Sequence, residues 1–345
     1  MGVFSPEQPY FGVDISNGGV RVVQLAKGAD HPLLIAYGDV ELDDKLSLSD
    51  APEDVGRLSQ VLKKLVVDAG VSINWVVIGL PTSKVFATVI TTPKLSSAEL
   101  AKAISFQAER FIPMNVAEAK LDWVLLGPGK SDQEQHVLLV AASNLAVNKY
   151  EQVVEQAGLE LLAVEPNVIA LSRAVLPAGS GVVMLVDVGQ VSTDLAIMNN
   201  GLPHLIRSVD AGVATLTRNV MKALGLQEGQ AEQFVAKFGL DVTKLEGQVF
   251  KAAKPTLELL VNEIGKSVQF FSGENPTLHL TKLILTGQAS SLPGFIQYLS
   301  EATKLPVESG NPWINVSYPT SRQAELAAVS SSYGVAVGLA MRGYV

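Results

Sequence analysis

The chain contains no cysteine among its 345 residues. Disulfide bonds, thiolate metal sites and cysteine nucleophiles are therefore excluded. Its 4 histidines are scattered along the sequence, and no pair of them has the spacing of metal ligands. The sequence also has no apolar run of membrane-spanning length, and residues 1–10 lack the basic and apolar regions of a secretory signal. We therefore expect no direct membrane span and no metal site built from cysteine or histidine.

Charge is the second scarce feature. Charged residues make up 17% of the chain, and the net charge is -8. Such an acidic chain does not fit a general nucleic-acid-binding protein. Hydrophobic residues make up 48%, so the chain can bury large cores. A chain of this length usually divides into two or more domains.

The pattern of strands and turns divides the chain into two halves. Residues 11–42 and 182–209 each predict a run of strands joined by short turns. The linker Pro-Ala-Gly-Ser-Gly at 177–181 separates the halves. Residues 85–158 predict a strand-helix-strand-strand-helix block that interrupts the first half, and residues 213–269 predict a helical region.

Each half opens on the same short motif. Segments 13–20 and 186–193 each contain a buried strand, an aspartate at its end, a turn of small residues and a returning strand. We interpret this as an internal duplication, although two unrelated hairpins with an aspartate in each turn would give the same pattern. Backbone N–H groups in two such turns can bind phosphates from both sides. Asp14 and Asp187, facing each other across a cleft, can hold Mg²⁺ together with its waters.

A third segment, from Thr286 to Gly294, lies between a predicted strand and a predicted helix. Its small residues would let a base or a ribose approach the backbone closely. Taken alone, the segment is equally consistent with a plain strand-to-helix turn. Neither of the two aspartate turns is a Walker motif or a Gly-x-Gly-x-x-Gly dinucleotide loop. The three segments together therefore predict a nucleotide site of another kind.

Together these segments resemble the five-motif signature of the actin and chaperone ATPase superfamily. The five matching segments are 12–20, 164–174, 186–194, 285–294 and 332–340. Within the superfamily, nearly the whole chain is similar to the family of the type IV pilus assembly protein PilM, a relative of the cell-division protein FtsA. Residues 106–113, Phe-Gln-Ala-Glu-Arg-Phe-Ile-Pro, are similar to a helix end in the inserted subdomain of that family.

The resemblance implies an α/β fold that is two-lobed, actin-like and ribonuclease H-like, with an inserted 1C (SHS2-type) subdomain. The implied divisions are lobe I (1A) at 1–84 and 158–179, the 1C insert at 85–157, lobe II (2A) at 180–210 and 277–345, and the 2B subdomain at 211–276.

The resemblance also implies roles around ATP and Mg²⁺. Asp14 and Asp187 would hold Mg²⁺ through its water shell, and Glu165 would lie near the attacking water as a candidate base. The two turns that would line the phosphates comprise Ser16, Asn17, Gly18, Gly19, Gly189, Gln190, Val191 and Ser192. The residues implied around the adenosine are Gly287, Gln288, Glu263 and Lys266.

Some of these implied contacts have an alternative. Glu263 and Lys266 are three residues apart on one helix face, and an exposed ion pair explains them equally well. Ser16 stands where the first phosphate motif usually has glycine, so its Cβ would crowd the phosphates or its hydroxyl would donate to one of them. We therefore expect ATP binding with slow hydrolysis.

The resemblance further implies a cytoplasmic protein that a partner recruits to the inner membrane. In proteins of this family a groove between the 1A part and the insert holds the N-terminal peptide of PilN, an inner-membrane protein, and we expect a PilN-like partner here. Other pilus assembly ATPases and a second copy of the chain are further candidate partners. The apolar residues Phe106, Phe111, Ile112 and Met114 either contribute to this groove or close the core of the insert.

Two other functions stay open. A metabolic small-molecule kinase of the same superfold needs a carboxylate base between the lobes, and Asp210 is the candidate, although it equally suits a helix cap. A pseudo-enzyme that binds ATP without useful turnover is the other alternative, and Ser16 is consistent with it. We expect no amphipathic membrane-binding helix of the FtsA kind at the end of this chain.

Overall fold

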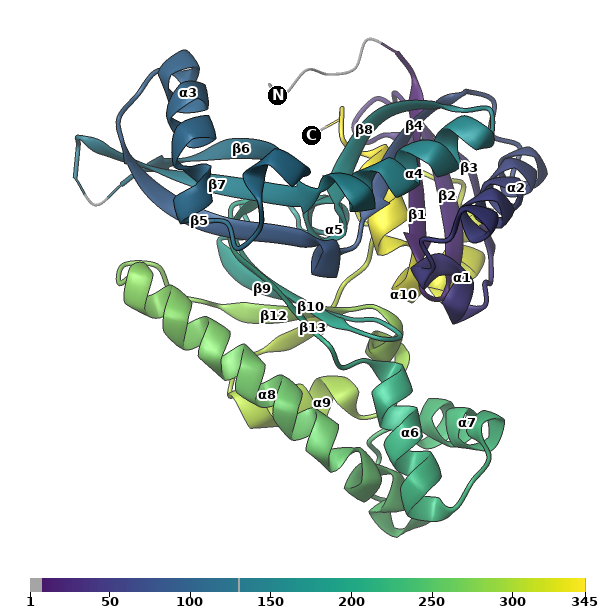
Figure 1. The fold of residues 1–345 in the computed structure, drawn as a ribbon. Helices are drawn as coiled ribbons and strands as arrows, with labels where there is room; N and C mark the ends of the chain where they lie inside the picture. Colours follow the sequence, from purple (N-terminus) through teal and green to yellow (C-terminus); the bar gives the residue numbers. More distant parts are fainter. Residues whose placement is uncertain (1–7, 130, 345) are drawn as a thin grey trace.

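Two five-stranded sheets form the centres of two lobes, and a three-stranded sheet projects from the first lobe (Figure 1). The computed structural model describes residues 8–129 and 131–344. The first sheet has the strand order β3-β2-β1-β4-β8. Its strands are β1 (Tyr10–Ser16), β2 (Gly19–Ala26), β3 (Leu33–Val40), β4 (Trp75–Leu80) and β8 (Glu160–Pro166). β1, β2 and β3 are antiparallel, whereas β4 and β8 run parallel to β1.

The second sheet repeats this plan with the order β11-β10-β9-β12-β13. Its strands are β9 (Val182–Val188), β10 (Thr193–Asn199), β11 (Leu202–Val209), β12 (Lys282–Thr286) and β13 (Val307–Ser309). Here too the first three strands are antiparallel and the last two run parallel to β9. The shared strand order agrees with the duplication that the two aspartate turns predict.

The central strand of each sheet carries one of the two aspartates near its carboxyl end. β1 and β9 are almost continuously apolar and buried, as is typical of a strand that is covered on both faces. Asp14 and Asp187 are therefore held by the most deeply packed strands of the two lobes. The turns that follow them lead directly into β2 and β10.

The insert has its own sheet, of order β5-β7-β6, and its own small core. Its strands are β5 (Val85–Pro93), β6 (Ala119–Pro128) and β7 (Glu134–Ser143), and α3 (Ser97–Gln107) packs against them. Ile112 is buried in this core and Met114 packs against it. By contrast, 88% of Phe106 and 37% of Phe111 are exposed. The four apolar residues therefore divide into two that close the core and two that lie on the surface.

Helix α4 (Asn144–Gln156) belongs by its packing to lobe I. It lies beside α2 (Pro52–Asp68), and its apolar side chains join the core under the first sheet. The division implied by the sequence placed this helix in the insert, at 85–157. The difference has a topological reason: β4 and β8 are parallel neighbours, and parallel neighbours need a crossover that is usually a helix. α4 supplies that crossover.

Lobe II also carries helices of its own. They are α6 (Val213–Leu224), α7 (Glu228–Phe238), α8 (Gln248–Glu274) and α9 (Phe295–Thr303). A five-residue helix, α1 (Asp44–Leu48), precedes α2 in lobe I. The short 3-10 turns are η1 (Thr82–Lys84), η2 (Ala108–Arg110), η3 (Val116–Glu118), η4 (Leu245–Gly247), η5 (Gln288–Ser291) and η6 (Thr320–Arg322).

Two helices cross between the lobes. α5 (Asn167–Val175) and α10 (Gln323–Ala340) pack against each other, and their shared core takes side chains from both sheets. The crossing is close: a Cβ at Gly338 would lie 1.8 Å from the carbonyl oxygen of Ala170. α10 also packs on β1, where a Cβ at Gly12 would lie 2.4 Å from the carbonyl oxygen of Ala336. The final helix, which the sequence-based division placed in lobe II, therefore also contacts the first sheet.

Within residues 8–129 and 131–344, no helix is both long and apolar enough to cross a bilayer.

Candidate functional site

A cavity of about 510 Å³ lies between the two lobes and is lined by both aspartate turns. Its volume falls within the roughly 300–1,000 Å³ range of small-molecule sites. The predicted residues that line it are Asp14, Ser16, Asn17, Gly18, Asp187, Gly189, Gln190, Val191, Ser192, Gly287 and Gln288. The fold thus brings together three segments that are distant in the sequence, two of them from equivalent places in the duplicated sheets.

Four predicted residues lie outside the wall of this cavity: Gly19, Glu165, Glu263 and Lys266. Gly19 closes the first hairpin, where its φ of 145° and the nearby carbonyl oxygen of Val40 leave no room for a side chain. It shapes the first turn without lining the cavity.

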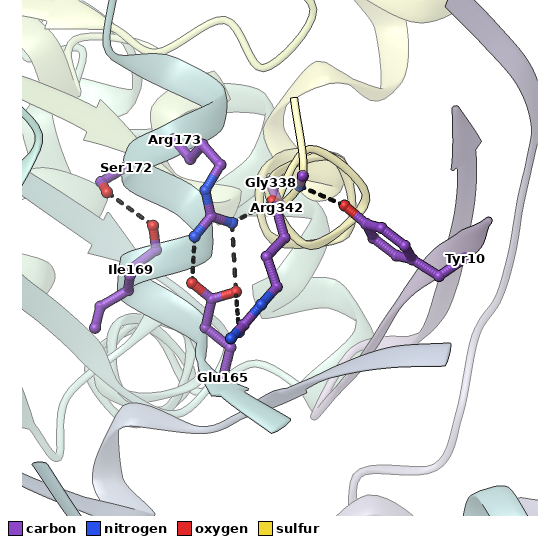
Figure 2. Close-up of polar contacts among 8 residues, drawn as sticks. Tyr10, Glu165, Ile169, Ser172, Arg173, Gly338 and Arg342 are labelled. Atoms are coloured by element: carbon purple, nitrogen blue, oxygen red, sulfur yellow. Dashed lines mark hydrogen bonds and ion pairs between the residues drawn. The ribbon is translucent and has the colours of Figure 1, made fainter. Parts of the chain in front are cut away.

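Glu165 is engaged in a buried ion cluster, which Figure 2 shows. Its carboxylate accepts hydrogen bonds from Arg173 on α5 and from Arg342 just after α10, the latter at 3.3 Å. Arg173 also donates to the carbonyl oxygen of Gly338 at 2.6 Å. Both carboxylate oxygens are therefore occupied by guanidinium groups that tie the two crossing helices to β8. This placement does not favour the predicted action of Glu165 on water in the cavity.

Asn167, two residues further on, does line the cavity, as does Leu171 of the same segment. Its Oδ1 is buried and has no hydrogen-bond partner among the described residues. A Cβ added at Gly79 of β4 would lie only 2.1 Å from Asn167 Oδ1, so the two residues pack tightly against each other. The motif at 164–174 thus indicates the correct strand end, but the polar residue of this motif that lines the cavity is Asn167.

Glu263 and Lys266 form an ion pair with each other on α8, with Nζ and Oε1 2.6 Å apart. The Lys266 side chain is 64% exposed, and Glu263 also lies 3.8 Å from Arg207. This geometry matches the alternative of an exposed ion pair. Gly265-Lys266-Ser267 repeats only the last part of a Walker motif and lies inside a helix, so it forms no phosphate loop.

The electrostatics of the cavity are dominated by buried carboxyl groups. Burial raises the pKa of Asp14 to about 6, although the Arg21 guanidinium lowers it in part. Burial raises the pKa of Asp187 to about 7, and the charge of Asp194 adds to this shift. Burial also raises the pKa of Asp194, which accepts a hydrogen bond from Ser208 at 2.6 Å. Asp194 ends the motif at 186–194, yet the sequence alone assigned it no role.

Arg21 is the cation that accompanies these carboxyl groups. Its Nη1 lies 3.7 Å from Asp14 Oδ2 and donates to Ser16 Oγ at 3.0 Å. The Ser16 hydroxyl in turn donates to the carbonyl oxygen of Gly19 at 3.4 Å. Ser16 therefore uses its hydroxyl to hold Arg21 and the turn, and this engagement explains how a serine is accommodated where the motif usually has glycine.

The carboxyl groups fit a hydrated cation better than a directly coordinated one. Among residues 8–129 and 131–344, no three acidic or histidine side chains come close enough together to hold a metal. Asp14 Oδ1 is buried without a hydrogen-bond partner in the same part of the chain. A buried carboxylate oxygen without a partner, in a cavity that Asp187 and Asp194 also line, would be stabilised by a cation and its waters.

The third segment closes the cavity from lobe II. Gly287 has a φ of 76°, and a Cβ there would lie 2.5 Å from the carbonyl oxygen of Val188. Thr286 donates to Asp187 Oδ1 at 2.9 Å, so this segment also orients one of the two aspartates. Gln288 Nε2 lies 3.2 Å from the position that a Cβ would take at Gly18, so its side chain reaches the first turn across the cleft.

Duplicated five-stranded sheets around one interlobe cavity define an actin-like fold, and solved structures agree. The chain resembles a PilM-PilN type IV pilus biogenesis complex with a TM-score of 0.83 and 24% identity, covering 99% of this chain and 100% of that chain. It also resembles the ethanolamine utilization protein EutJ from Carboxydothermus hydrogenoformans, with a TM-score of 0.59, 14% identity and coverage of 96% and 88%. For MreB5 of Spiroplasma citri bound to AMPPNP the TM-score is 0.54, the identity 12% and the coverage 98% and 95%.

The particular family follows from the sequence match. The family model of the type IV pilus assembly protein PilM matches residues 12–344, which is nearly the whole chain. The chain therefore belongs to this family of pilus assembly proteins.

Proposed function

We propose that this chain binds ATP together with Mg²⁺ in the interlobe cavity and thereby regulates its part in pilus assembly. The observation that carries the proposal is the pairing of Asp14 and Asp187, which lie at equivalent places in two matching sheets and line one cavity. Buried carboxyl groups with raised pKa values and one unpaired oxygen support a site for a hydrated cation. Nucleotide-bound members of the same fold give further support.

Asp14 and Asp187 hold the cation through its waters in this proposal. Mg²⁺ would supply positive charge that offsets the charge of the phosphates. The backbone N–H groups of the turns 16–18 and 190–192 donate to the phosphates from the two lobes in this proposal. Gly287 and Gln288 back the adenosine in this proposal, because both line the cavity from lobe II.

Turnover is slow in this proposal. The carboxylate that the resemblance suggested as a base, Glu165, is paired with two arginines outside the cavity. Asn167 takes the place beside the cavity, and an amide orients water but does not remove its proton. Asp210 does line the cavity, which is the feature that a kinase of this superfold would need. Membership of the pilus assembly family favours a nucleotide-dependent scaffold over such a kinase.

Isothermal titration of the purified chain with ATP tests the nucleotide site. We expect binding in Mg²⁺ and weakening of at least about tenfold when EDTA replaces it or when Asp14 is changed to Asn. Binding that is unchanged by both would overturn the Mg²⁺ role, and no binding at all would overturn the nucleotide site. Phosphate release that a small sugar stimulates would favour the kinase.

The second part of the proposal concerns the partner. The chain is a cytoplasmic protein that binds the N-terminal peptide of a PilN-like inner-membrane protein and is recruited to the membrane by it. Family membership and the likeness to a PilM-PilN complex support this. The exposed side chains Phe106 and Phe111 on the insert offer an apolar contact surface for such a peptide.

Fluorescence anisotropy with a labelled peptide from the N-terminus of a PilN-like protein tests the partner. Phe106→Ser is expected to weaken binding about tenfold or more, because the side chain is 88% exposed and its loss leaves the core intact. The matched control is Leu259→Ser on α8, where an apolar residue is also exposed, and it should leave binding unchanged. Equal affinity of the Phe106 variant and the parent would remove this residue from the interface.

A further inference from the structure

Lys149 is a buried lysine in the wall of the cavity that belongs to none of the sequence motifs. It lies on α4, and only 8% of it is exposed. A buried ammonium group is stable only with partners. Its Nζ donates to the carbonyl oxygen of Ser47 at 2.8 Å and lies 3.2 Å from Asp50 Oδ1. Both partners lie in or next to α1, so Lys149 joins α4 to that short helix.

The short helix α1 connects Lys149 with the first phosphate turn. With five residues it is too short to be stable alone, so its position depends on contacts with the rest of lobe I. Ser47 is 6% exposed, and its hydroxyl donates to Asn17 Oδ1 at 3.1 Å. A continuous chain of contacts therefore runs from α4, through α1, to a residue that lines the cavity.

These contacts determine how the Asn17 amide is presented. An amide side chain has one accepting oxygen and one donating NH₂ group. Because the oxygen accepts from Ser47, the NH₂ group is left to donate to an anion in the cavity. Without Ser47 in place the amide could rotate and present its oxygen, which repels a phosphate.

We propose that Lys149 is a positioning residue for the first phosphate turn: through Ser47 it orients the Asn17 amide so that the turn offers a donor to the phosphates of a nucleotide. The inference rests on the proposed nucleotide site. Asp50 and the Ser47 carbonyl group already engage the Lys149 ammonium group. Because these two partners engage two of its three N–H donors, Lys149 acts on the phosphates through the turn in this proposal.

A double-mutant cycle on the full chain tests this role, with Mg²⁺-ATP affinity measured by isothermal titration. Lys149→Met and Asn17→Ala are each expected to weaken binding about tenfold, the effect of losing one charge-assisted hydrogen bond. The double variant should bind no more weakly than Asn17→Ala alone, because Lys149 acts through Asn17. The control is Lys64→Met on α2, whose side chain is 77% exposed and paired with Asp68, and it should bind like the parent.

Two further variants keep the test decisive if Lys149→Met fails to fold. Ser47→Ala removes the linking hydroxyl and leaves the Lys149–Asp50 pair, and it should weaken binding as much as Asn17→Ala. Lys149→Arg retains a cation for the same two acceptors and should restore most of the affinity. Additive losses in the double variant, or parent-like binding by Ser47→Ala, would overturn the positioning role. A parent chain that fails to bind ATP would instead overturn the proposed function, and the inference with it.

Discussion

At the scale of single residues, the proposed cation site depends on the carboxyl groups of Asp14 and Asp187. The folded-state pKa of Asp187, about 7, lies above its ordinary value of 3.8. The folded chain therefore holds this proton more tightly between about pH 4 and pH 7, and stability falls as the pH rises through that window. The site is built at the expense of stability in the absence of a cation, as is common at functional sites.

Asp187→Asn should therefore stabilise the nucleotide-free chain at high pH. A neutral side chain needs no ionisation, so we expect the free energy of unfolding at pH 8 to rise by on the order of 2 kcal/mol. Near pH 4 the parent carboxyl is itself protonated in the folded state, and the two chains should be equally stable. Urea unfolding at both pH values measures this, and a variant that is less stable than the parent at pH 8 would contradict the electrostatic picture.

Ser16 is the second residue whose effect can be predicted. Its hydroxyl accepts from Arg21, so Ser16→Gly and Ser16→Ala should both free the guanidinium for the phosphates. We expect about threefold tighter ATP binding for both, the worth of one modest hydrogen bond. If only the glycine variant gains affinity, crowding by the Ser16 Cβ is the cause instead. Unchanged affinity in both variants would show that Ser16 plays neither part.

Some residues in and around the cavity could be placed from the sequence, and others could not. The position of both aspartates and of all the turn residues except Gly19 in the wall of one cavity could be predicted, because a strand, an aspartate and small residues are consecutive in the chain. Glu165 could not be placed correctly, because one of its partners, Arg342, is 177 positions away in the sequence. Lys149 gave no signal either, since the role proposed for it depends on the position of α1.

At the scale of elements, the crossing of α5 and α10 sets how the lobes meet. Gly338→Ala should lower the free energy of unfolding by about 3 kcal/mol, because its Cβ would collide with the backbone at Ala170. The control is Gly265→Ala on α8, where in the described part of the chain nothing lies within 4 Å of the new Cβ. That variant should be stabilised by about 0.5–1 kcal/mol through helix propensity. Similar unfolding curves for both variants would contradict the close crossing.

Glu165→Gln tests the other contact at this crossing. The variant leaves two partly buried guanidinium groups without their carboxylate, and we expect a loss of about 2 kcal/mol in stability. The rate of phosphate release at saturating ATP should stay within about twofold of the rate of the parent chain, because Glu165 is not the catalytic base in the proposed function. A large loss of turnover in a stable variant would restore the catalytic role that the sequence resemblance implied.

The order of the helices and strands could be predicted from the sequence more fully than the way they pack. The repeated motif anticipated two equivalent sheets, and the composition of 177–181 anticipated the boundary between the halves. The sequence could not show that α4 belongs to lobe I, because this depends on β4 and β8 being neighbours across the whole insert. Sequence periodicity shows that a helix has an apolar face but not which sheet that face covers.

At the scale of the whole molecule, the crossing helices α5 and α10 pack between the two lobes, and the insert projects from lobe I (Figure 1). The cavity takes residues from both lobes, so a ligand that bridges them would favour a closed arrangement. α4 follows directly after β7 of the insert and carries Lys149. The site and the insert are therefore joined through one helix, which is consistent with a protein that holds a partner.

The most direct test of the central claim is a crystal structure of the chain with Mg²⁺ and a non-hydrolysable ATP analogue. We predict phosphates between the turns at 16–18 and 189–192, a hydrated Mg²⁺ beside Asp14 and Asp187, and the adenine ring against Gly287. An analogue bound elsewhere, or an interlobe cavity that stays free of nucleotide at saturating concentration, would contradict this prediction.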